Sequence, residues 1–291
     1  MPSPLLSLVT AELSAPADPR AAAMARALAA KYPQAARAVL FYGSCLRERN
    51  LDGLMLDFYL IVSDYGAAYG KGWLARANRL IPPNVFPFEH DGLIAKYAVL
   101  SEADFARLCG PQADNVSVWA RFAQPSRLLW TSDEQARAGV IAAVALAAPT
   151  LLSLARPMAK GEDVLALWRA GFTLTYNAEL RAERKGRSLS IVDADPERYR
   201  GFGEAAVAQG LPPSPLDPLR HWRRLQRRGK WLSIVRLAKA SFTYAGGIDY
   251  LAWKINRHAG TAIEIRPWQR RWPLLGALTL LPRLFLRGSI R

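Results

Sequence analysis

The sequence predicts an α+β fold: a mixed sheet with helices first, then a mostly helical region, then a basic C-terminal segment. Three short apolar runs rich in β-branched and aromatic residues, at 38–42, 54–63 and 93–100, predict strands. Helix-like blocks follow at 138–155 and 162–184. With 291 residues and 51% hydrophobic residues, the chain can bury a substantial core.

The remaining local patterns place further elements along the chain. Residues 20–32 are rich in alanine and end before Pro33, which predicts a helix. Ser101 precedes Glu-Ala-Asp and is predicted to cap another helix. Residues 189–192 resemble a strand, and the proline-rich residues 212–215 resemble a linker.

Residues 138–155 are uncharged, which raises the question of a membrane span. The stretch is rich in alanine, Pro149 interrupts it, and its length barely reaches the minimum of about 17 residues for a span. We therefore expect a buried helix.

The charge is concentrated at the C-terminal end. The formal net charge of the chain is +15, and residues 220–291 contain sixteen Lys and Arg against two acids. Tryptophans alternate with these cations, and the apolar residues 273–287 are too short to span a bilayer. This composition is typical of a segment that lies in the interface of an anionic membrane, and it is also compatible with a polyanion such as nucleic acid.

The cysteine content and the first residues favour an intracellular protein. Cys45 and Cys109 are the only cysteines, which cannot build a disulfide framework. The first residues have no basic stretch followed by an apolar core, so we expect no signal peptide.

The pattern with the clearest chemistry is Gly43-Ser44 at the end of one predicted strand, followed by Asp57 within the next. A Gly-Ser turn lets the backbone approach a phosphate closely, and its N–H groups and hydroxyl can donate to phosphate oxygens. A carboxylate on the neighbouring strand can hold Mg²⁺, which bridges nucleotide phosphates. Together these residues predict a nucleotidyltransferase core.

This core usually has two acids separated by one residue, and here the first position is Met55. Asp52 is close in sequence and is a candidate second ligand, although we expect it in the preceding loop. Asp57 could alternatively be a surface acid on an edge strand. Lys96 lies inside an apolar strand and is predicted to face the triphosphate and offset charge on the leaving pyrophosphate. The alternative is a lysine that extends to solvent from a sheet edge.

Several short segments, taken in order, resemble the mitochondrial-type phosphatidate cytidylyltransferases, the translocator-maintenance proteins of mitochondria and their bacterial relatives. The segments are Phe-Tyr-Gly-Ser at 41–44, Met-Leu-Asp-Phe at 55–58, Pro-Asn-Val-Phe at 83–86, Ile-Ala-Lys-Tyr-Ala-Val-Leu-Ser at 94–101, Ala-Arg-Phe-Ala-Gln-Pro at 120–125, and Ala-Gly-Phe at 170–172 with Tyr-Asn-Ala-Glu-Leu-Arg at 176–181. The resemblance covers roughly residues 38–200.

The resemblance implies three parts: a nucleotidyltransferase domain at 1–135, a winged-helix-like domain at 136–215, and a membrane-associating region at 216–291. It implies Mg²⁺-dependent transfer of CMP from CTP to phosphatidate, which forms CDP-diacylglycerol and pyrophosphate. Gly43, Ser44 and Lys96 would bind the nucleotide, and Asp57 would bind the metal with Asp52 or Glu179.

Tyr176 and Arg181 would contact phosphatidate. As an alternative to binding the metal, Glu179 could be a solvated helix residue. The family pattern also lacks the first acid of the metal pair. The sequence departs from it at Cys45, where the family has glycine, and in a shortened segment at 69–78. The protein would lie peripherally on the cytoplasmic side of the inner membrane, with CTP, phosphatidate and the anionic bilayer as partners and no nucleic acid.

Two other functions fit the same residues. One is a nucleotidyltransferase that acts on RNA or a small molecule, with the basic segment holding nucleic acid. The other is a non-catalytic module of the membrane surface.

His90, His221 and His258 form no pattern typical of a general base, and the phosphate monoester of phosphatidate, with a second pKa of about 6, needs none.

Overall fold

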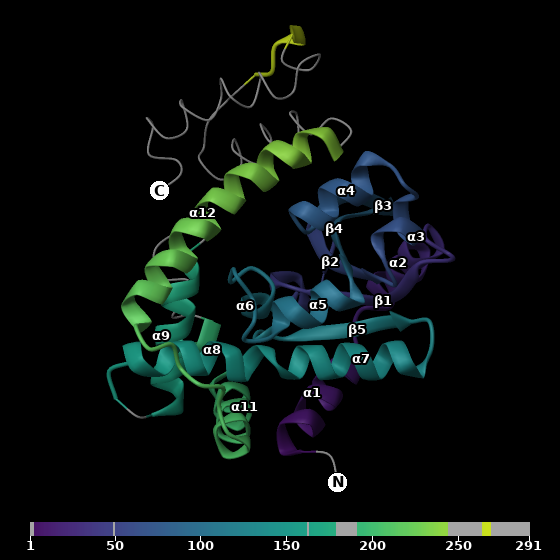
Figure 1. The fold of residues 1–291 in the computed structure, drawn as a ribbon. Coiled ribbons are helices and arrows are strands. Elements are labelled where there is room, and N and C mark those ends of the chain that lie inside the picture. The colour runs from purple at the N-terminus through teal and green to yellow at the C-terminus, as the bar shows by residue number, and fades with distance from the viewer. Residues whose placement is uncertain (1–2, 49, 162, 179–190, 244–263, 269–291) are drawn as a thin grey trace.

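The protein is α+β in the computed structural model, which describes residues 3–48, 50–161, 163–178, 191–243 and 264–268 (Figure 1). One five-stranded mixed sheet has the strand order β3-β4-β2-β1-β5. Its strands are β1 (Ala36–Tyr42), β2 (Met55–Val62), β3 (Asn84–His90), β4 (Leu93–Ser101) and β5 (Ser126–Thr131). β2 and β4 are parallel, and the other three pairings are antiparallel. The predicted strands at 38–42, 54–63 and 93–100 are confirmed.

Helices surround the sheet and then continue alone. They are α1 (Pro4–Ser14), α2 (Pro19–Ala30), α3 (Tyr65–Tyr69), α4 (Trp73–Leu80), α5 (Glu102–Cys109), α6 (Trp119–Phe122), α7 (Glu134–Ala145), α8 (Ala147–Ala155), α9 (Val164–Tyr176), α11 (Pro196–Gln209) and α12 (Pro218–Thr243), with 3₁₀ turns η1 (Ser44–Arg47) and η2 (Arg156–Met158). Ser101 caps α5 as predicted, because its hydroxyl accepts from the Asp104 N–H at 3.2 Å.

Alternation along the strands divides the buried side chains between two faces of the sheet. On one face, Val39, Phe58 and Val99 pack with residues of α2, α3 and α4. On the other, Leu40, Tyr59 and their neighbours pack with residues of α1 and α5–α7. Both faces are covered, which explains why β2 reads as a continuous apolar run.

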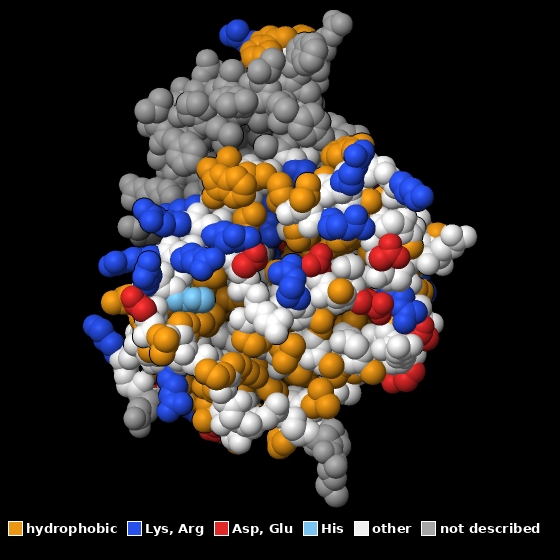
Figure 2. All heavy atoms as spheres, viewed as in Figure 1, with side chains coloured by type: hydrophobic (Ala, Val, Ile, Leu, Met, Phe, Trp, Pro, Cys, Tyr) orange, Lys and Arg blue, Asp and Glu red, His pale blue; other side chains and the backbone are white. Residues whose placement is uncertain are grey.

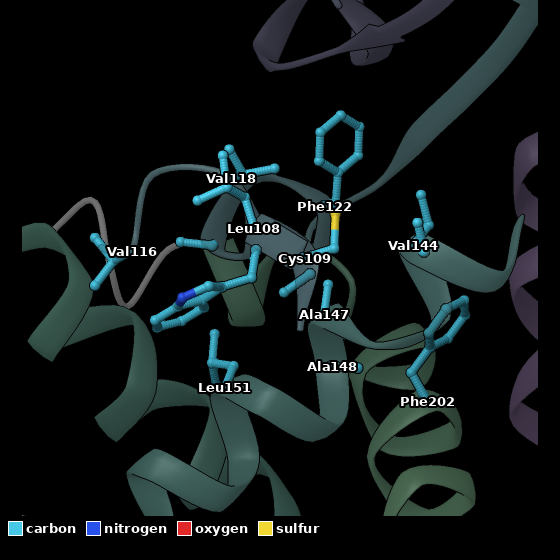
Figure 3. Close-up of a cluster of buried hydrophobic side chains, with 14 of the residues drawn as sticks. Leu108, Cys109, Val116, Val118, Phe122, Val144, Ala147, Ala148, Leu151 and Phe202 are labelled. Carbon is cyan, nitrogen blue, oxygen red and sulfur yellow. The ribbon is translucent and has the colours of Figure 1, made fainter. Parts of the chain in front are cut away.

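The second cluster continues from the sheet into the helical part without a break. It includes residues of α8, α9, α11 and α12. Figure 3 shows where α5, α6, α7, α8 and α11 meet, with Phe122, Cys109, Ala147 and Phe202 among the labelled side chains. The sheet and the helices after residue 133 therefore share one hydrophobic core.

The α7–η2 stretch, at 134–158, is the one helical segment of the described residues that is long and apolar enough to cross a membrane. Its most apolar window is 67% buried inside the protein. That burial agrees with the prediction of a core helix at 138–155. Helix α9, at 164–176, confirms part of the helical block expected at 162–184; residues 177 and 178 form a turn, and residues 162 and 179–184 lie outside the described residues.

α12 follows the proline-rich linker predicted at 212–215 and extends from the helical part to the β3 edge of the sheet (Figure 1). Near its start, the buried Trp222 meets Trp119 edge-on and donates its indole N–H to Leu154 O at 2.8 Å. Near its end, Arg236 and Lys239 bind backbone carbonyls of the α4–β3 connection. The helix is therefore attached to both parts.

The prediction of a strand at 189–192 is wrong where it can be checked. Residues 191–193 are helical, and Ile191 and Val192 are buried in the shared core. Packing of these apolar side chains overrides their β propensity. Residues 189 and 190 lie outside the described residues, as do residues 269–291, where the apolar terminal segment is expected.

Candidate functional site

The turn after β1 has a conformation that glycine alone adopts readily. Gly43 has φ +94° and ψ −168°, and a Cβ atom placed on it would lie 3.2 Å from Oδ2 of Asp57. Glycine is thus required both by the backbone angle and by the carboxylate beside it. The predicted Gly-Ser turn and the predicted strand acid lie side by side.

Asp57 and Lys96 are paired directly across the parallel strands β2 and β4. The Lys96 ammonium lies 3.0 Å from Oδ1 of Asp57, and the two side chains are 30% and 23% exposed, respectively. Oδ1 is shielded from solvent, and within the described residues it meets Lys96 as an ion pair without hydrogen-bond geometry. The two charges neutralise each other at a partly open position.

The pair belongs to a row that crosses the whole sheet. In register, the row contains Ser126, Tyr42, Asp57, Lys96 and Pro87, from β5 to β3. It continues the sheet face that packs on α5–α7, at the end where β1 finishes and where β2 and β4 begin. The site is thus at the margin of the shared core.

Tyr42 interacts with both the Asp57 carboxylate of this ion pair and a second cation, Arg121. Burial raises the pKa of the Tyr42 phenol well above its usual value, the Asp57 carboxylate adds to the rise, and a hydrogen bond from Arg121 opposes it. The phenol is therefore neutral at physiological pH. Its ring contacts Tyr59 and Phe122 at centroid distances of 5.2 and 6.0 Å.

Ser44 and Cys45 face different surroundings. Ser44 is exposed at the first position of η1, where the N–H groups of a helical turn have no partner within the turn. Cys45 is buried, and its thiol donates to Met55 O at 3.5 Å. Burial raises the pKa of the Cys45 thiol, and Asp57 adds to the rise. The cysteine therefore joins the turn to the start of β2.

Asp52, which the sequence suggests as a second metal ligand, is engaged in an ion pair. Its carboxylate accepts from Arg20 of α2 at 2.7 Å, and its side chain is 64% exposed. The loop position expected for it is confirmed, since it lies in the turn before β2.

No cluster of three or more His, Cys, Asp or Glu side chains occurs among the residues that the structure describes. Mg²⁺ does not require such a cluster, because one carboxylate, substrate phosphates and water can complete its shell. The shielded Oδ1 of Asp57 provides one oxygen of the right kind.

Tyr176 ends α9 and is partly buried against the shared core. Glu179 and Arg181, the other residues proposed for metal and lipid, lie outside the described residues.

Sequence reasoning assigned no role to Tyr42 or Arg121, although both stand in segments that resemble the family. It also missed the contacts of Arg236 and Lys239. A signal for Tyr42 was available, because it directly precedes the Gly-Ser turn. The contacts of Arg121 and Arg236 depend on tertiary packing: Arg121 donates to Ser117 O, and Arg236 donates to Ser117 Oγ at 2.9 Å.

Compared with known proteins, the chain matches neither a protein-family model nor a curated protein.

Proposed function

We propose that this protein is a nucleotidyltransferase that transfers CMP from CTP to phosphatidate, giving CDP-diacylglycerol and pyrophosphate. One observation supports the proposal most: a glycine turn, a carboxylate and a lysine from three different segments lie together at one margin of the sheet. Gly43 lies beside Oδ2 of Asp57, and Lys96 lies 3.0 Å from Oδ1.

The proposal includes a finer assignment of the architecture. The sheet and its helices up to residue 135 would be a nucleotidyltransferase fold, and residues 136–215 would be a winged-helix-like domain. A Gly-Ser turn directly after β1, beside the acid that the neighbouring strand β2 bears, supports the first assignment. The second rests on the sequence resemblance.

In the proposed reaction, a phosphate oxygen of phosphatidate attacks the α-phosphorus of CTP. A new P–O bond forms, the bond from the α-phosphorus to the bridging oxygen breaks, and that electron pair leaves with pyrophosphate. The monoester is already largely ionised at neutral pH, since its second pKa is near 6. Placement and charge stabilisation then account for catalysis.

Each residue of the site has a part in this scheme. The absence of a side chain at Gly43 lets the triphosphate approach the backbone, and Ser44 can donate its hydroxyl to a phosphate oxygen. Lys96 is placed to exchange its partner Asp57 for the charge on the leaving pyrophosphate. Tyr42 is paired with Asp57 across β1 and β2 and accepts a hydrogen bond from Arg121, so Tyr42 and Arg121 are candidates to orient the carboxylate.

Mg²⁺, when bound, would neutralise charge on the transferring and leaving phosphate oxygens. Asp57 would hold it, provided that its carboxylate is released from Lys96. Asp52 is engaged with Arg20, so it would have to leave that ion pair to contribute.

The exposed face of α12 supports an anionic partner. Six of its cations are exposed, namely Arg220, Arg223, Arg224, Arg227, Arg228 and Lys230, and Trp231 between them and the β3 edge is 59% exposed. Each Lys or Arg near an anionic membrane contributes about 1 kcal/mol of binding. Such a helix would hold the protein where its water-insoluble acceptor is found, peripherally on the cytoplasmic side of the inner membrane.

Substitution of the strand acid tests the proposal. The purified chain is incubated with labelled CTP, Mg²⁺ and phosphatidate vesicles, and label in the lipid fraction is measured. Asp57→Asn should lower transfer by roughly 10²- to 10³-fold, because it removes the metal-binding charge. Asp193→Asn is the matched control, since Asp193 is an exposed partner of Arg169 on another surface.

The outcomes separate the alternatives. Wild-type transfer by Asp57→Asn would exclude Asp57 as the metal ligand. Label that enters RNA or a small alcohol, with none in lipid, would favour a different acceptor. No CTP binding by the wild-type chain in calorimetry would point to a non-catalytic module. Removal of residues 267–291 should reduce activity on vesicles much more than CTP binding.

A further inference from the structure

The exposed side of α4 combines large apolar groups with cations. Leu80 is 80% exposed and Trp73 is 48% exposed, and Arg76 and Arg79 between them are exposed as well. Lys71, just before the helix, is also exposed. We call these five residues the α4 face. A short helix of this kind is typical of peptides that lie in a membrane interface.

The inner side of α4 is fixed to the sheet by its own polar contacts. The buried Asn78 donates to Val99 O at 2.9 Å and accepts from the Asn84 N–H. Asn84 in turn donates its side-chain amide to Leu74 O at 3.1 Å. Ala75 is buried between these contacts. The helix thus presents the α4 face from a rigid support, so a partner can bind there without having to order the backbone of α4.

The chain segment that contains α4 carries charge of one sign. From residue 65 to residue 88 the sequence has three cations and no acid. At the C-terminal end of the helix, Arg236 of α12 adds a further cation, because its guanidinium donates to Pro82 O at 2.9 Å. In Figure 2, Lys and Arg gather across the upper part of the described surface, over α4 and α12, with large hydrophobic side chains between them.

We infer that the α4 face is a second membrane-docking surface, which binds an anionic bilayer in addition to the basic C-terminal region. Trp73 and Leu80 enter the interface, and Lys71, Arg76 and Arg79 bind lipid phosphates. Membrane binding is also part of the proposed function, but binding through the α4 face requires neither CTP nor phosphatidate and is tested without them.

Two other occupants fit the α4 face less well. A symmetric contact with a second copy would place three cations against the same three cations, which is repulsive. A nucleic acid would engage the cations but would leave the 80% exposed Leu80 without an apolar partner. Lipid satisfies both the charge and the apolar groups.

A fluorescent probe at position 80 tests the contact directly. Leu80→Cys is labelled with an environment-sensitive fluorophore, and vesicles of equimolar phosphatidylcholine and phosphatidylglycerol are added to the full chain. The native Cys45 and Cys109 are buried and should label slowly. A blue shift is expected, whereas Val207→Cys on α11, an exposed apolar position of a different helix, should show none.

Removal of charge gives a second, independent measurement. Arg76→Gln with Arg79→Gln should weaken co-sedimentation with the same vesicles by about 25-fold, at about fivefold for each charge. Arg26→Gln with Arg200→Gln removes two exposed cations from α2 and α11 and should leave binding within about twofold, since these side chains do not lie on the α4 face.

The outcomes are distinct. Unchanged sedimentation of the Arg76/Arg79 variant, together with no shift at position 80, would show that the C-terminal region binds alone and would overturn the inference. A shift that depends on protein concentration without vesicles would indicate self-association, and a shift with RNA alone would indicate nucleic acid; either would also overturn it. Loss of CMP transfer with vesicle binding intact would affect only the proposed function.

Discussion

At the scale of single residues, Gly43 is the position where backbone and site chemistry depend on each other. Gly43→Ala forces an alanine to φ +94° and places its Cβ 3.2 Å from the Asp57 carboxylate. The backbone strain is about 1–3 kcal/mol. We expect a lower Tm and, in addition, CTP binding weakened by at least about tenfold, as measured by calorimetry.

Gly53→Ala is the matched control for this prediction. Gly53 also has a positive φ, +70°, but a Cβ there meets nothing within 4 Å. This variant should therefore lose stability with little change in CTP binding. If both variants lose CTP binding equally, the contact between Gly43 and Asp57 has no special role.

Two acids of very different burial allow a second comparison. Glu12 accepts from the Arg198 guanidinium in a pair whose side chains are 12% and 8% exposed, and Arg198 also donates to Ala123 O. Glu12→Gln leaves a buried charge without its partner, so it should lower the free energy of unfolding by about 3–5 kcal/mol. The measurement is urea denaturation.

Asp52→Asn provides the contrast, because its ion pair with Arg20 is exposed. Its expected cost is below about 1 kcal/mol. The same variant also tests Asp52 as a metal ligand: CMP transfer close to that of the wild type would exclude the role, and a loss comparable to that of Asp57→Asn would establish it.

Sequence reasoning identified Gly43, Asp57 and Lys96 because unusual residues in apolar runs are visible without a structure. It did not predict that Asp57 and Lys96 form an ion pair, since that requires the parallel register of strands almost forty residues apart. Arg121 went unassigned for the same reason. Contacts between distant segments are set by topology.

At the scale of elements, α12 and the α4–β3 connection form a pH-sensitive junction. Lys239 donates to Pro83 O at 2.8 Å and also to Ile81 O. Burial lowers the pKa of Lys239 to about 7, and Arg236 adds to the lowering. An unfolded lysine titrates near 10.4.

Between about pH 7 and pH 10 the unfolded chain therefore holds a proton that folded Lys239 has lost. Stability from this group must rise with pH across that window, by roughly 1.4 kcal/mol per pH unit at most. Lys239→Met should abolish the rise. The free energy of unfolding of the wild type and of Lys239→Met is measured by denaturation at several pH values. The difference between the two chains removes the contributions of the other titrating groups. A difference that stays constant with pH would contradict the prediction.

Elements with a strong local pattern were the ones predicted: β1, β2, β4, α2 and the buried helix of α7 and α8. β3 and β5 were missed. Pro87 lies within β3, and proline argues against a strand unless the strand is at an edge, as β3 is. β5 combines Arg127 with apolar residues and is also an edge strand. The N-terminal helix α1 gave no periodic pattern long enough to recognise.

At the scale of the whole molecule, the shared core makes the proposed parts interdependent. Residues of β1, β2, α8, α9 and α12 belong to one cluster. We expect thermal unfolding of the full chain to be one cooperative transition. A fragment of residues 1–135 should not fold alone, because it lacks α7, which packs on β1, and it lacks α8 and Trp222, which pack on α6.

Circular dichroism in the near ultraviolet and calorimetry test this prediction. A sharp transition in the 1–135 fragment would show that the domain boundary expected from the sequence is also a folding boundary. The family resemblance suggested that boundary, and a continuous core across it can be recognised only when the packing is known.

The pairing of Asp57 with Lys96 has a consequence for the resting protein. Since the ammonium already balances the carboxylate, we expect folding to need no divalent ion; in the proposed reaction the ion would arrive together with the nucleotide. A chelator should then leave the melting temperature of the unliganded chain unchanged, whereas CTP with Mg²⁺ should raise it. In the proposed reaction, Lys96 would hold the place that Mg²⁺ takes at Asp57 when the nucleotide binds.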